Sequence, residues 1–76
     1  MTNYRTIVEL SNGCHKILRL SYEQVAHVVS EVRKFKNALF REVRYVTFSG
    51  VTLCLNEILS WKFINEYTGE EFLSIS

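Results

Sequence analysis

The sequence predicts an α+β fold in which one helix packs on one face of a mostly antiparallel sheet of four or five strands, in the order ββαβββ. Three observations predict it. The stretch from Ser21 to about Phe35 has helical periodicity. The segments on both sides of it alternate apolar and polar residues, as strands do. Turn sequences that contain glycine, at residues 11–13 and 49–50, separate these segments.

Residues 4–10 and 14–20 are expected to form the first hairpin. A two-residue Asn-Gly turn would place Leu10 opposite His15 and divide the apolar residues between both faces. A three-residue loop with Gly13 in the left-handed conformation pairs Leu10 with Cys14 instead. We favour this loop because it gathers apolar side chains on one face, namely Val8, Leu10, Cys14, Leu18 and Leu20.

The helix begins with a capping box, in which Ser21 and Gln24 each satisfy a free backbone N–H. Its apolar stripe follows three- and four-residue steps: Tyr22, Val25, Val28, Val29, Val32 and Phe35. Valine is a poor helix former, so this helix must be stabilised by burying its stripe against the sheet.

Residues 42–48 and 51–55 are expected to form a second hairpin around Ser49-Gly50. A two-residue turn gives one apolar face, which we place under the helix: Val46, Phe48, Val51, Leu53 and Leu55. Residues 58–64 follow as a fifth strand that pairs with the fourth. Residues 65–76 form an edge strand or a loosely docked tail of this single 1–76 domain.

The simple register of the fifth strand places an apolar set away from the helix: Tyr45, Leu59, Trp61 and Phe63. Because one helix covers only one face of a sheet, this set would be an exposed patch that binds a protein. In the alternative register, Trp61 and Phe63 lie in the core, and Ile58 and Ile64 are exposed.

Charge is unevenly distributed along the chain, although the net charge is only +1. Residues 33–56 carry a net +4 and residues 57–76 a net −3. The cations of the middle segment offer a nucleic-acid-binding alternative through phosphate contacts: Arg33, Lys34, Lys36, Arg41 and Arg44. The acidic tail, with Glu66, Glu70 and Glu71, either pairs with this segment or faces a basic partner.

No pattern predicts catalysis, a metal or a cofactor. Cys14 and Cys54 are expected to be reduced and packed, and their spacing from His15 and His27 matches no structural zinc site. The apolar runs are too short to span a membrane, and no signal pattern begins the chain. We therefore expect a cytoplasmic protein that is not an enzyme and has no small-molecule substrate.

The order hairpin, helix and residues 43–48 with a Ser-Gly turn resembles the first half of the ubiquitin-type β-grasp fold. It departs from that fold where residues 58–64 follow a tight turn. A short chain without motifs is also similar to accessory proteins of phages and mobile elements. These observations together predict a small homodimeric module that binds a host protein and inhibits or regulates it.

Overall fold

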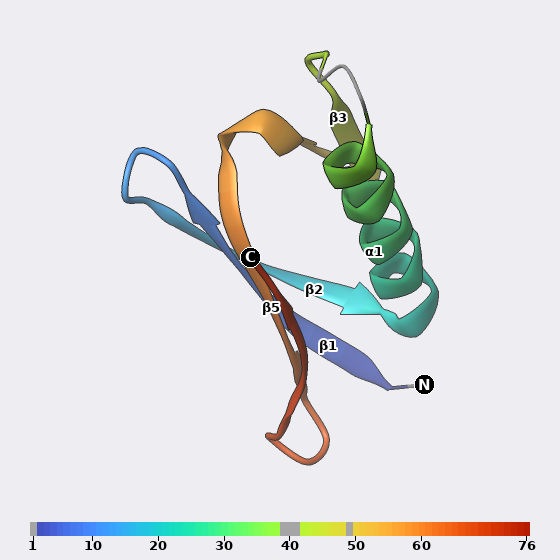
Figure 1. Ribbon diagram of the computed structural model, residues 1–76. Coiled ribbons are helices and arrows are strands. Elements are labelled where there is room, and N and C mark those ends of the chain that lie inside the picture. The colour runs from blue at the N-terminus through green and yellow to red at the C-terminus, as the bar shows by residue number, and fades with distance from the viewer. Residues whose placement is uncertain (1, 39–41, 49) are drawn as a thin grey trace.

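The computed structural model describes residues 2–38, 42–48 and 50–76. Its elements, in chain order, are β1 (Asn3–Leu10), β2 (His15–Ser21), α1 (Tyr22–Asn37), β3 (Tyr45–Phe48), β4 (Val51–Cys54), a 3₁₀ turn (Leu55–Glu57), β5 (Ile58–Asn65) and β6 (Glu71–Ile75). One antiparallel sheet has the order β2-β1-β5-β6, and β3 and β4 form a second sheet of two strands. The helix lies on one side of the larger sheet (Figure 1). The predicted α+β class, with the helix after two strands, is confirmed.

The first hairpin has the register of the three-residue loop. Glu9 pairs with His15, and the Leu10 N–H donates to the Cys14 carbonyl at 2.8 Å. Gly13 has φ of 89°, a left-handed conformation that glycine adopts without steric cost. Val8 and Leu20, two members of the apolar face predicted for this hairpin, are buried.

Helix α1 is capped as predicted. The Ser21 hydroxyl accepts from the Gln24 N–H at 3.3 Å, and the Gln24 side-chain oxygen accepts from the Ser21 N–H at 2.9 Å. The helix ends at Asn37, two residues beyond the predicted end at Phe35. Its buried residues are Val25, Val28, Val32 and Phe35.

The second hairpin also has the predicted register, since Val46 pairs with Leu53. Both side chains are buried, as is Leu55, so this face contributes to the core. Strand β3 begins at Tyr45 rather than at Glu42. The side chain of Phe48 lies outside the part of the chain that the structure describes.

The pairing predicted for β5 is wrong, because β5 pairs with β1 and not with β4. The 3₁₀ turn after β4 leads the chain away from the second hairpin to the free side of β1. Both neighbours of β1 are therefore antiparallel to it, whereas a β-grasp fold needs a parallel final strand beside the first.

This pairing also decides which way β5 faces. Trp61 lies opposite Val8 and Phe63 lies opposite Thr6, so both rings point to the helix side. They are 3% and 0% exposed and belong to the core. The prediction that Trp61 and Phe63 lie on an uncovered face is wrong, and the alternative that places them in the core is right; Ile58 and Ile64 are half-buried rather than exposed.

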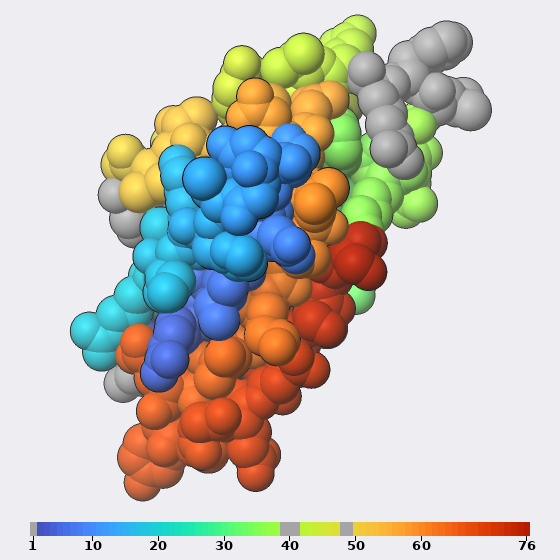
Figure 2. All heavy atoms as spheres, turned by 90° about the vertical axis from the view of Figure 1, so that its left-hand side faces the viewer, coloured from blue at the N-terminus to red at the C-terminus, as the bar shows by residue number. Residues whose placement is uncertain are grey.

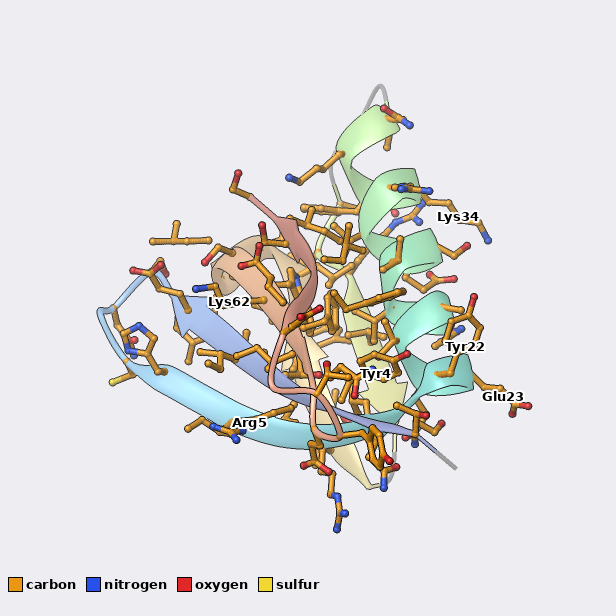
Figure 3. The ribbon with its side chains drawn as sticks, turned by 90° about the horizontal axis from the view of Figure 1, so that it is seen from below. Tyr4, Arg5, Tyr22, Glu23, Lys34 and Lys62 are labelled. Carbon is orange, nitrogen blue, oxygen red and sulfur yellow. The ribbon has the colours of Figure 1, made fainter. Side chains whose placement is uncertain are left out.

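The face of the larger sheet away from the helix is formed by the four strands alone. Figure 2 shows β1 and β2 beside β5 and β6 across this side of the molecule. Arg5 points away from the helix and Tyr4 points toward it (Figure 3). Within the described residues, α1 is too short and too polar for a membrane-spanning helix.

Candidate functional site

Helix α1 carries a second row of side chains beside its buried stripe. Tyr22, Ala26, Val29 and Arg33 follow each other at steps of four, three and four residues, so they lie on one face. We call this row the outer stripe. Tyr22 is 59% exposed and Ala26 is also exposed, while Val29 is half-buried. The outer stripe is thus an apolar surface that ends in a cation and remains accessible.

Strand β6 lies next to this stripe and is an edge strand of the larger sheet. Its pairing with β5 shifts between Phe63 and Ile64, which marks a β-bulge. Near this bulge the ring of Phe72 lies 4.9 Å from the ring of Tyr4 and 6.3 Å from that of Tyr22. The three rings fix the start of β6 beside the first turn of the helix.

A groove of about 600 Å³ separates the outer stripe from β6. We call it the α1–β6 groove. It is lined by Tyr22, Val25, Ala26, Val29, Ser30, Arg33, Lys34, Asn37, Phe72 and Leu73. The helix and β6, the dark red strand that ends at the C-terminus, run in the same direction (Figure 1). At the far end, the Lys36 ammonium donates to the backbone oxygen of Ser76, so the two elements are tied at both ends.

The groove is apolar at its start and basic toward its end. Arg33 and Lys34 are exposed and line it, and Lys34 projects from α1 away from the sheet (Figure 3). Lys34 has a neighbour in Glu31, at 3.6 Å. Arg33 makes no ion pair with any carboxylate that the structure describes. Its charge is therefore available to a ligand.

The four residues predicted to bind a protein do not form one surface. Trp61 and Phe63 are buried, as described above, while Tyr45 and Leu59 are 63% and 55% exposed. Tyr45 belongs to the two-stranded sheet, and Leu59 lies at the start of β5 in the larger one. Leu59 lines a hollow with Phe35 and Leu55 that is distinct from the α1–β6 groove.

The five cations of the nucleic-acid alternative are also divided. Arg33 and Lys34 line the groove, and Lys36 is bonded to Ser76. Arg44 precedes β3, where its backbone N–H donates to the Asn56 side-chain oxygen at 3.0 Å. Arg41 lies outside the described residues. The structure therefore brings Arg33 and Lys34 together in one groove without Arg44.

The glutamates of the acidic tail do not form ion pairs with the described cations of the basic segment 33–56. Glu66, directly after the end of β5, lies 2.9 Å from Arg19 of β2, and Glu71 of β6 lies 3.7 Å from Lys62 of β5. Glu70 is exposed. Among the described residues, no ion pair joins this tail to the segment 33–56.

The two cysteines are free, and Cys14 is exposed rather than packed. His15 and His27 are exposed. In the described ranges, no three side chains of histidine, cysteine, aspartate or glutamate are grouped as a metal site requires. These residues therefore define no reactive or metal-binding centre that would compete with the groove as the candidate site.

Sequence reasoning did not find the α1–β6 groove. It assigned Tyr22 and Val29 to the core stripe, and it placed Phe72 in a segment that forms either an edge strand or a loosely docked tail. The edge strand is the alternative that the structure has. The available signal was the width of the helical stripe, since six apolar residues span a wider arc than one narrow sheet covers.

Comparison of the chain with models of protein families, with curated proteins and with solved structures finds no match.

Proposed function

We propose that the chain is a non-enzymatic protein-binding module that captures part of a partner protein in the α1–β6 groove. One observation carries the proposal: an accessible apolar stripe of α1 lies directly beside an edge strand. Exposed apolar surface with a polar rim is typical of interaction sites. A partner segment bound in the groove would no longer be accessible to other molecules. In this way binding would inhibit or regulate the partner.

The groove suits a polypeptide better than a small molecule. It is open along the outer stripe. Its helix wall combines apolar side chains with polar ones such as Ser30 and Arg33, and its β6 wall adds the apolar Phe72 and Leu73. Small-molecule pockets bury most of the ligand surface. A peptide needs only a groove with a row of apolar contacts and a few polar anchors.

Peptide selection tests this proposal with two substitutions one residue apart. A displayed library of random peptides is selected on the purified chain, and binding of the enriched peptides is then measured by fluorescence anisotropy. Ala26→Glu places a carboxylate in the groove. His27→Glu adds the same carboxylate at an exposed position that does not line it. We expect A26E to abolish binding and H27E to preserve it.

Two results would contradict the proposal. One is a selection that enriches no binding peptide, and the other is an equal loss of binding in both variants. If the chain instead binds single-stranded DNA or RNA, with an affinity that falls steeply as salt rises, the nucleic-acid alternative replaces it.

A further inference from the structure

We propose that the occupant of the α1–β6 groove is an extended, acidic segment of a partner protein that adds as a strand to the free edge of β6. This inference rests on the proposed function and specifies its partner. The chemistry of the segment follows from three features of the groove: the backbone groups of β6, the width of the sheet under α1, and the charge of the last turns of the helix.

The pairing pattern identifies the backbone groups that β6 presents. In an antiparallel ladder, alternate residues exchange hydrogen bonds with one neighbour and direct the others to the opposite side. The Asn3 carbonyl accepts from the Glu66 N–H, and the Asn65 N–H donates to the Glu70 carbonyl. Residue 65 thus bonds toward β6 and residue 66 toward β1. By the same alternation, Phe63 and Trp61 of β5 form hydrogen bonds with β6, where their partners are Leu73 and Ile75.

Ser74 lies between these two residues, so its N–H and C=O point away from β5. No described strand follows β6 in the sheet, and Ser74 is exposed. A row of unpaired backbone groups is a template for another strand. Peptide recognition by strand addition uses such an edge, with main-chain bonds for affinity and side-chain pockets for specificity.

The outer stripe lies where an added strand would run. Neighbouring strands are about 4.8 Å apart, so a strand beyond β6 would extend the sheet under the part of α1 that no described strand covers. Alternate side chains of that strand would meet Ala26 and Val29, and the others would face solvent. Helix α1 contacts β6 at Tyr22 and again at Lys36. The distance between these two contacts limits how long the bound partner segment can be.

Charge complementarity gives the segment its acidic character. The exposed cations of the groove, Arg33 and Lys34, lie toward the C-terminal end of α1. The opposite end begins beside Phe72, directly after Glu70 and Glu71. A ligand with a carboxylate next to Arg33 and an apolar residue next to Phe72 matches both ends.

The other edge of the sheet lacks these features. Strand β2 exposes Lys16, a residue type that protects sheet edges from pairing, and it continues directly into α1. The α1–β6 groove is lined by Phe72 and Leu73 of β6 and by none of the residues of β2. The two edges therefore differ in a way that favours β6.

Backbone N-methylation of an enriched peptide tests strand addition on the unaltered protein. A methyl group on nitrogen removes one main-chain donor and blocks the approach of a neighbouring strand. We expect methylation at every second peptide residue to lower affinity by at least about tenfold, and methylation between these positions to have little effect, because a strand bonds its neighbour at alternate residues. A three- or four-residue period, or no period, would overturn strand addition.

Substitutions in the groove provide the complementary test. Ser74→Pro removes the outward N–H but no ladder bond to β5, a position that proline tolerates in edge strands. Ser74→Thr keeps that N–H. Only S74P should lose peptide binding, with the circular dichroism of both variants unchanged; equal affinities would overturn the proposal.

Arg33→Glu tests the charge of the ligand. It should abolish the preference for acidic peptides in selection, and an unchanged preference would overturn the charge assignment.

The two proposals fail in different ways. Without any enriched peptide whose binding A26E abolishes, the groove is not a protein-binding site. With such peptides but no two-residue period, the groove binds protein in another mode.

Discussion

The two rows of side chains on α1 are made of similar residues but have different surroundings. The inner row, Val25, Val28, Val32 and Phe35, is at most 8% exposed and packs against both sheets. The outer stripe begins with a 59% exposed tyrosine and borders a groove. The difference shows that the helix has a wider apolar arc than the four strands and the second hairpin together cover.

The apolar arc of α1 is wider than the packing of the fold requires. An amphipathic helix needs an apolar face only as wide as the surface that it buries. The outer stripe adds apolar surface that folding alone leaves exposed, at a position where the sheet ends in an edge strand. A strand supplied by a partner would complete the packing on this side, as β1, β5 and the second hairpin do on the other.

The largest expected effect is on the buried side. Trp61→Ala removes a ring that is 3% exposed and stacks on Phe63, with centroids 6.2 Å apart. Truncation of a buried aromatic residue costs about 3–5 kcal/mol, a large part of the stability of so small a domain. We expect a loss of the cooperative unfolding transition in circular dichroism. A native-like transition would contradict the assignment of Trp61 to the core.

Adjacent valines compare the two rows directly. Val28 is fully buried and Val29 lines the groove. We expect Val28→Ala to lower the free energy of unfolding by about 2 kcal/mol, from lost methyl burial plus a cavity. Val29→Ala should change it by less than about 0.5 kcal/mol, because alanine is the better helix former and the site is partly exposed. Urea denaturation measures both, and equal losses would contradict the distinction between the rows.

A smaller effect of opposite sign concerns Thr6, whose side chain is fully buried opposite Phe63. Its hydroxyl has no hydrogen-bond partner among the described residues. Thr6→Val keeps the shape and removes the desolvated hydroxyl, so it should raise stability by about 1 kcal/mol. The control is Thr47→Val, since the Thr47 hydroxyl lies 3.1 Å from that of Thr52 and should not gain. A loss of stability in the Thr6 variant would show that its hydroxyl is bonded.

Local features of the fold were predictable from sequence because neighbouring residues determine them. The capping box at Ser21, the loop at Gly13 and the register of the second hairpin all follow from side-chain chemistry within a few positions. The partner of β5 was not predictable in this way. The 3₁₀ turn at Leu55–Glu57 sends β5 to β1, about fifty residues earlier in the chain, and no local pattern encodes that choice.

The candidate site was missed for the same reason. The groove forms only because β6 lies beside the outer stripe, and this depends on the non-local pairing of β5 with β1. The sequence correctly predicted that an apolar surface stays uncovered. That surface was expected on the sheet, on the face away from the helix, but the one that borders an edge strand belongs to the helix. Tyr45 and Leu59 remain exposed, whereas the rings of Trp61 and Phe63 fill the core.

Amide hydrogen exchange at Ser74 tests the central claim most directly, in the free protein and with an enriched peptide bound. The control is Ile17, whose N–H points outward from the opposite edge by the same alternation, since it pairs with Ile7. We predict that the peptide slows exchange at Ser74 and leaves Ile17 unchanged. Exchange at Ser74 that stays as fast with the peptide bound as without it would contradict strand addition in the α1–β6 groove.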